Sequence, residues 1–219
     1  MFLCKMVHNS SPPSDEPRRR RGRPRAFDPE TALQRAMDVF WAEGFAAASL
    51  DELSAATGLN RPSLYGAFGD KRALYVQAYR HYREQVRDVF APLLSTDAPI
   101  REKLRRILNA ALDLYLTGDA GPRGCFTVLT ASSEAVADPE IGAVVAQAIE
   151  ATDRALERLF ADALQKGELA AGADPKRLAR MTAATLHTLS VRARARLQRA
   201  AIEPVIDDAV AMICGATPG

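Results

Sequence analysis

Residues 49–68 read SLDELSAATGLNRPSLYGAF and contain the start and stop signals of two short helices. Ser49 is followed three residues later by Glu52, and this capping box predicts a helix that begins at residue 50. Gly58 tolerates positive φ, so it predicts the end of that helix and a sharp turn. Asn60 is a favourable N-cap for a second helix that runs to about residue 68. Two short helices joined by so tight a turn predict a helix-turn-helix.

The side chains of this segment divide into a buried set and an exposed set. Small residues, Ala55 and Ala56, are expected where the two helices cross. Five apolar residues are expected to seal the hairpin against a preceding helix: Leu50, Leu53, Leu59, Leu64 and Phe68. The polar face that remains would enter the major groove of duplex DNA, and it consists of Asn60, Arg61, Ser63 and Tyr65. The alternative is a helical hairpin that has no role in DNA binding.

Helix signals continue on both sides of the segment. Asp28 with Pro29 predicts the start of a first helix, and Gly44 predicts its end. Asp70 predicts the start of a fourth helix, whose apolar stripe is Leu74, Ala78, Tyr82, Val86, Val89 and Phe90. Beyond Pro92 we expect helices near 99–117, 123–136, 139–166, 175–197 and 204–214. Cap-plus-proline signals at Asp138 and Asp174 support two of these starts.

The fold expected from these signals is all-α, with an N-terminal three-helix helix-turn-helix unit, a C-terminal helical bundle and about nine helices in total. We expect a disordered basic arm over 1–26, the DNA-binding unit over 27–72 and a sensing and dimerisation unit over 73–219. Translation could begin at Met6 instead of Met1.

The positive charge is concentrated at the N-terminus. The chain has 219 residues and a net charge of +2, yet residues 1–26 alone carry seven Lys or Arg and two Asp or Glu. The arm contains Arg23-Pro24-Arg25, which resembles the core of AT-hook segments, and a thin Arg-Pro strand suits a narrow A·T-rich minor groove. We therefore expect Arg23 and Arg25 to bind DNA. The alternative is a solvated charge run that adds only nonspecific affinity.

Several classes of protein are disfavoured by the same sequence. Its three cysteines are widely spaced, which is typical of neither a disulfide framework nor a zinc site. No run of about 18 apolar residues is present, so we expect a cytoplasmic protein without a membrane partner. Paired carboxylates, a metal cluster and a nucleophile elbow are all missing, so we expect neither an enzyme nor a cofactor or metal.

The order and spacing of the framework residues resemble the TetR/AcrR family of regulators. The resemblance covers about 50 residues and is carried by Ala36, Phe40, Gly44-Phe45, Ser49-Leu50, Ala55-Ala56, Gly58, Ser63-Leu64-Tyr65, Phe68, Lys71 and Leu74. The arm and residues 64–71 are similar to the ComR-like branch. The chain departs from many family members at Gly66 and Ala67, where larger side chains are usual.

The resemblance implies a role for several residues in DNA binding. Ser49, Tyr65 and Lys71 would contact the DNA backbone. Asn60, Arg61 and Ser63 would contact base edges, although a phosphate contact is an alternative for Arg61.

The resemblance also implies a ligand pocket and a dimer. Candidates to line the pocket are Tyr82, Tyr115, Cys125, Phe126, Leu129 and His187, each of which is also explained as plain core. Cys125 precedes a predicted helix, which allows a redox or soft-metal role. The dimer would form through the last two helices, on Leu178, Met181, Ala184, Leu186, Leu189, Val205, Ala209, Met212 and Ile213, unless these residues only complete the monomer core.

The function expected from all of this is a homodimeric repressor that binds a palindromic operator and is released by a small molecule. Two alternatives remain at this point. One is an architectural binder of A·T-rich DNA without a sensing role, and the other is a redox- or metal-responsive regulator that uses Cys125. The effector, the operator and the choice between repression and activation are open.

Overall fold

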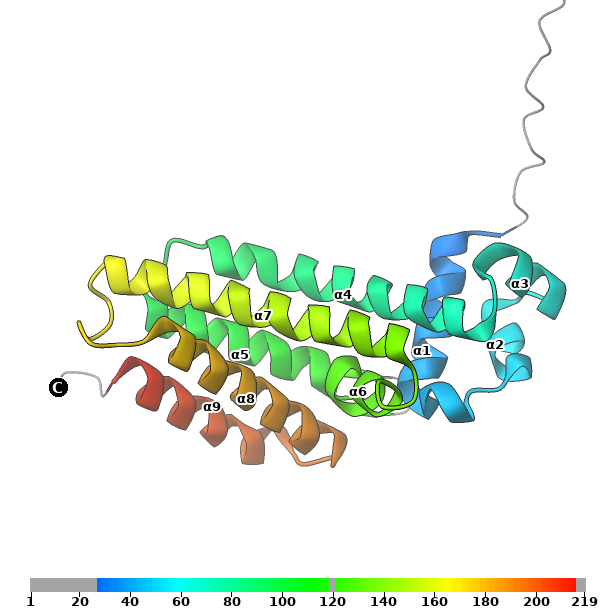
Figure 1. The fold of residues 1–219 in the computed structure, drawn as a ribbon. Coiled ribbons are helices and arrows are strands. Elements are labelled where there is room, and N and C mark those ends of the chain that lie inside the picture. The colour runs from blue at the N-terminus through cyan, green and yellow to red at the C-terminus, as the bar shows by residue number, and fades with distance from the viewer. Residues whose placement is uncertain (1–26, 119–120, 216–219) are drawn as a thin grey trace, which may run out of the picture.

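A computed structural model describes residues 27–118 and 121–215, and every regular element in these residues is a helix. In chain order the elements are α1 (Pro29–Ala47), α2 (Leu50–Thr57), α3 (Arg61–Phe68), α4 (Lys71–Ser95), α5 (Ile100–Leu116), the π-helical turn η1 (Thr127–Ala131), α6 (Ser132–Glu134), α7 (Pro139–Gln165), α8 (Pro175–Arg194) and α9 (Arg199–Cys214). Figure 1 shows α1, α2 and α3 at one end of an elongated bundle of the long helices. The expected all-α architecture is confirmed. Arg23 and Arg25, the arm residues expected to bind DNA, lie outside the described residues.

Six helices begin at the N-caps that the sequence indicates. In each case the cap side chain accepts a hydrogen bond from a backbone N–H of the first helical turn; the caps are Asp28, Ser49, Asn60, Asp70, Asp138 and Asp174. The capping box is complete, because Ser49 Oγ accepts from Glu52 N at 3.1 Å and Glu52 Oε2 accepts from Ser49 N at 2.7 Å. Since a cap of this kind contributes about 1 kcal/mol, these residues fix where the chain enters each helix.

Two prolines were expected at helix boundaries and lie inside helices instead. α4 continues past Pro92 to Ser95, and its end is supported by Thr96, whose backbone N–H and hydroxyl both donate to Pro92 O. α9 begins at Arg199, five residues before the expected start, and includes Pro204. A proline removes one backbone hydrogen bond from a helix, and near an exposed helix end water can replace it.

The segment around Gly44 agrees with expectation in part, and the segment before α6 differs from it. The backbone leaves helical geometry at Gly44, at φ +82°, where the helix was expected to end, and a short helical segment of α1 follows it to Ala47. The helix expected over 123–136 begins only near Phe126, and its first regular part is η1. Val89, expected on the apolar stripe of α4, is exposed, because the stripe is needed only where α5 and α7 cover it.

A cluster of aromatic rings joins the N-terminal unit to the bundle. Phe126 is fully buried at its centre, with its ring centroid 5.8 Å from that of Trp41 on α1 and 5.7 Å and 5.6 Å from those of Tyr75 and Tyr82 on α4. Each such ring pair contributes about 0.5–1.5 kcal/mol beyond the burial of its area. The first helix and the bundle are therefore continuous in one core.

Candidate nucleic-acid interface and internal cavity

The helix-turn-helix forms with the expected buried residues. Leu53, Leu59, Leu64 and Phe68 are buried, and Leu50 is half-buried against the same core. Gly58 ends α2 in the left-handed region at φ +71°. Ala55 is exposed, contrary to expectation; it is Thr57 that is buried beside the turn, where its hydroxyl donates to Leu53 O at 2.7 Å.

The exposed face of α3 carries the residues expected to meet base edges, but two of them are already engaged within the protein. Asn60 Oδ1 accepts from Ser63 N at 2.9 Å as the helix cap. The Arg61 guanidinium forms an ion pair with Asp51 at 2.8 Å, and both side chains are largely exposed. DNA would therefore compete with Asp51 for Arg61, and the Asp51 carboxylate adds negative charge to this face.

The three residues expected to meet the DNA backbone lie around the same face. Ser49 and Tyr65 are exposed, and Tyr65 leaves 42% of its surface to solvent. Lys71, at the start of α4, places its ammonium 4.7 Å from the centroid of the Phe45 ring. A cation held over a ring in this way can turn outward to a phosphate at little cost, because the exposed cation–π contact contributes only about 0.5–1 kcal/mol.

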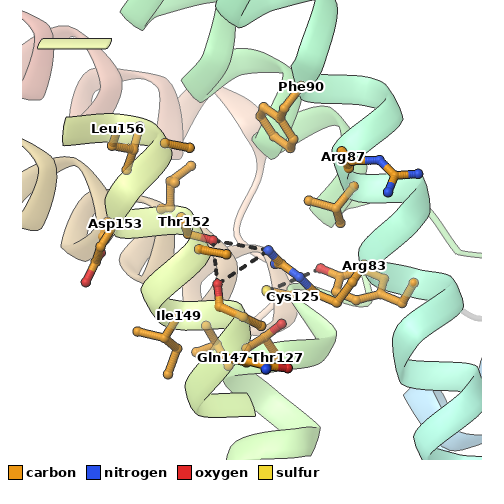
Figure 2. Close-up of a pocket in the computed structure, with 18 of the residues that line it drawn as sticks. Arg83, Arg87, Phe90, Cys125, Thr127, Gln147, Ile149, Thr152, Asp153 and Leu156 are labelled. Carbon is orange, nitrogen blue, oxygen red and sulfur yellow. Dashed lines mark hydrogen bonds between the residues drawn. The ribbon is translucent and has the colours of Figure 1, made fainter. Parts of the chain in front are cut away.

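A second feature is a cavity of about 770 Å³ inside the bundle. It is lined by residues of α4, α5, α7 and α8 together with the segment around Cys125, and Figure 2 shows labelled residues of α4 and α7 facing each other across it. Its volume falls within the range of small-molecule sites in proteins, roughly 300–1,000 Å³.

Four of the six residues expected to line a pocket do so: Tyr82, Tyr115, Cys125 and His187. His187 lies on an exposed part of the lining. Phe126 and Leu129 are not part of the lining, because Phe126 is enclosed by the aromatic cluster and Leu129 packs beside Gly124.

The cavity wall near Cys125 is a hydrogen-bonded cluster. The Tyr82 hydroxyl lies 3.3 Å from Cys125 Sγ, and the Tyr79 hydroxyl lies 3.1 Å from Thr127 Oγ1. Burial raises the pKa of the Tyr82 and Tyr115 hydroxyls well above the ordinary value for tyrosine. These phenols therefore stay protonated and can donate hydrogen bonds. Within the described residues, no group of three or more His, Cys, Asp or Glu side chains is arranged to hold a metal ion.

Sequence reasoning missed the polar residues that α4 and α7 bring into the cavity. Among them are Arg83 from α4 and Gln147, Thr152 and Asp153 from α7 (Figure 2), and the exposed Arg80, Glu84, Arg87, Arg154 and Arg158 also line the cavity. Arg83 follows Tyr82 directly, so a charged residue bordering an apolar stripe was the one available signal. Its partners on α7 are more than 60 residues away in the chain, and no local pattern links them.

The outer face of α8 and α9 exposes several apolar side chains. Met181, Val191 and Met212 leave 49%, 50% and 77% of their surface to solvent. Of the residues expected on a dimer face, Ala184 is exposed too, whereas Leu178, Leu186, Val205, Ala209 and Ile213 are half-buried against the core. Leu189 is fully buried in the chain's own core, so it is not available to a partner. None of the described helices combines the length and apolar character needed to cross a membrane.

Known proteins share both units of this architecture. Residues 32–78 match the family model for bacterial regulatory proteins of the tetR family, and residues 101–208 match a tetracyclin repressor-like C-terminal domain. The chain is 27% identical over 175 residues to the transcriptional repressor ComR of Escherichia coli K12, an alignment covering 80% of this chain and 83% of ComR. It is 36% identical over 107 residues to the repressor BdcR of the same organism, covering 49% of this chain and 54% of BdcR.

A solved structure of a relative matches both units of the chain. CifR, a TetR family transcriptional regulator solved with 26-bp double-strand operator DNA, is 37% identical, with a TM-score of 0.76, and the match covers 86% of this chain and 98% of CifR. These relatives are transcription regulators and not enzymes. The chain has a capped helix-turn-helix and an all-helical bundle, and both of its units match TetR family models. It therefore belongs to the TetR family of DNA-binding transcription regulators.

Proposed function

We propose that this protein is a homodimeric transcriptional repressor that leaves a palindromic operator when a small molecule binds the internal cavity. The observation that carries the proposal is the shared wall between the cavity and the DNA-binding unit. Tyr82 lines the cavity, and its ring lies 4.9 Å from that of Trp41, which belongs to α1. A ligand that displaced Tyr82 would therefore press on the helix that supports α2 and α3.

Other contacts support the same coupling. Arg72 at the start of α4 pairs with Asp138 at 2.6 Å and with Glu140 at 2.8 Å, which ties α4 to the start of α7. At the end of α8, Arg194 donates to the Ala42 carbonyl of α1 at 3.2 Å. A ligand that changes the spacing of α4 and α7 would thus change the orientation of the N-terminal unit, and a difference in ligand affinity between the two arrangements is what allostery requires.

The relatives and the exposed α8–α9 face support the dimeric and repressing parts of the proposal. ComR and BdcR are named as repressors, and CifR was solved with double-strand operator DNA. Met181, Val191 and Met212 expose apolar surface on α8 and α9, and exposed apolar surface is a feature of protein interfaces. A symmetric dimer places two readers on two half-sites, so a palindromic operator follows from the symmetry.

We propose that DNA contacts come from Ser49, Asn60, Arg61, Ser63, Tyr65 and Lys71, with Arg23 and Arg25 of the arm adding minor-groove contacts.

Arg61 offers the sharpest test, because its ion pair with Asp51 predicts opposite effects for the two partners. Arg61→Ala should lower operator affinity about 5- to 100-fold, as expected for the loss of a base or phosphate contact. Asp51→Asn should raise it severalfold, because a competing negative charge is removed. Arg106→Ala, which changes an exposed arginine on α5, is the control and should leave affinity unchanged. Fluorescence anisotropy measures all three variants, and equal affinity of Arg61→Ala and the wild type would exclude Arg61 from the interface.

The function itself is tested by selecting bound fragments from genomic DNA of the source organism with the purified full chain. We expect one or a few inverted repeats to be enriched, a footprint with two half-sites, and the mass of one or more dimers on the DNA by sedimentation. A library of metabolites is then screened for release of the selected fragment. Uniform recovery of A·T-rich DNA without a repeat would contradict the proposal in favour of an architectural protein.

A further inference from the structure

Arg83 gives the cavity a positive charge that the protein does not neutralise. Its guanidinium reaches from α4 toward α7, where it donates to Thr152 Oγ1 at 3.2 Å and to the Ala148 carbonyl at 3.4 Å (Figure 2). Both acceptors are neutral. The Thr152 hydroxyl itself donates to the Ala148 carbonyl at 3.0 Å, which leaves its oxygen to accept from Arg83.

Several arginines of the bundle have a carboxylate partner that Arg83 lacks. Within the described residues no Asp or Glu pairs with it, whereas Arg72, Arg105 and Arg199 each pair with at least one carboxylate. Asp153 also lines the cavity, but Figure 2 shows its side chain directed away from Arg83. Holding a half-buried cation without a counter-charge costs free energy, so an anion that entered the cavity would recover that cost.

Three tyrosine hydroxyls of the lining can donate hydrogen bonds, and the lining also holds the carboxylates of Glu84 and Asp153. The hydroxyls of Tyr79, Tyr82 and Tyr115 belong to lining residues, and their pKa values are raised by burial, so they remain protonated. The positive charge of Arg83 lowers the pKa of all three hydroxyls, but burial has the larger effect. The apolar part of the lining is formed among others by Val86, Phe90, Leu94, Ile107, Leu114 and Leu156, and exposed charged residues border it.

We propose that the effector is an amphiphilic monocarboxylic acid whose carboxylate binds Arg83 and whose apolar body lies against α4 and α5. Arg83 is the half-buried arginine of the lining, whereas Arg80, Arg87, Arg154 and Arg158 line the cavity with exposed side chains. A half-buried cation without a carboxylate partner favours a single negative charge beside it, and the planar guanidinium matches a carboxylate with two parallel hydrogen bonds. The protonated phenols of the lining can donate to a ligand that displaces their contacts with Thr127 and Cys125. This inference rests on the proposed function, because it takes the cavity to be the sensing site.

The test compares each acid with the alcohol of the same carbon skeleton. Calorimetry or tryptophan fluorescence measures binding of straight-chain monocarboxylates of four to twelve carbons and of phenylalkanoates, each paired with its alcohol, to the full chain at pH 7.5. We expect at least one acid to bind 10- to 100-fold more tightly than its alcohol, as a charge-assisted hydrogen-bonded pair predicts. Arg83→Met should abolish this preference while keeping alcohol binding. Arg83→Lys should retain part of it, and Arg106→Met, which removes an exposed arginine from α5, is the control.

The outcomes separate this inference from the proposed function. It is overturned if no acid in the panel binds, if the alcohols bind as tightly as the acids, or if Arg83→Met keeps the preference with a circular dichroism spectrum unchanged from the wild type. The same ligands are added to the protein bound to its selected DNA fragment. An acid that binds through Arg83 without releasing DNA supports the carboxylate site but contradicts its role as the effector site. Release of DNA by neutral compounds alone supports the proposed function and overturns the carboxylate site.

Discussion

Phe126→Ala is expected to lower the free energy of unfolding by about 3–5 kcal/mol, the range for deleting a buried aromatic ring. Phe126 is fully buried, and rings from both α1 and α4 surround it. Its neighbours are large and held by helices on two sides, so they cannot collapse into the space that the ring leaves. The cost should therefore lie toward the upper end of the range.

Urea unfolding followed by circular dichroism, at one fixed protein concentration, measures this change. The melting temperature should fall with it, by about 2–4 °C for each kcal/mol in a chain of this length. Phe90→Ala is the matched control, because it deletes the same atoms from a half-buried position on the cavity wall. An equal loss of stability in the two variants would show that the aromatic cluster does not join α1 to the bundle as described.

The N-terminal unit could be predicted from the sequence because its signals are local. Each cap acts on a backbone N–H two or three residues away, so Ser49 and Asp70 determine the start of their helices without help from the rest of the chain. The tight turn at Gly58 needs only the φ that glycine allows. The errors arose where tertiary packing overrides a local rule, as at Pro92 and Pro204, which stay helical because α4 and α9 are held against other helices.

The cavity could be predicted only in part. The family resemblance named Tyr82, Tyr115, Cys125 and His187 among six candidates for the lining, and these four do line the cavity. Arg83 and Thr152 become partners only through the packing of α4 against α7. The charge of the site, which decides the class of ligand, is therefore a property of the tertiary structure.

Gly124→Ala is expected to lower the free energy of unfolding more than Gly167→Ala, although both glycines have a similar positive φ. Gly124 has φ +69°, where any residue with a Cβ is strained by about 1–2 kcal/mol. A Cβ here would also lie 2.9 Å from the Ser190 carbonyl oxygen of α8 and would clash with the Leu129 side chain. Because a backbone carbonyl cannot rotate away, we expect about 1–3 kcal/mol of further cost from overpacking.

Gly167→Ala separates these two contributions. Gly167 has φ +74°, but no atom lies within 4 Å of a Cβ placed on it, so only the backbone strain applies. Ser190 Oγ accepts a hydrogen bond from Cys125 N at 2.7 Å, so displacement of α8 at Gly124 would also move the cavity wall. Gly124→Ala should therefore lose about 1–3 kcal/mol more stability than Gly167→Ala in urea unfolding and should weaken ligand binding as well. Equal losses in the two variants would mean that α8 is free to move away from this turn, and the cavity would then have no fixed wall on that side.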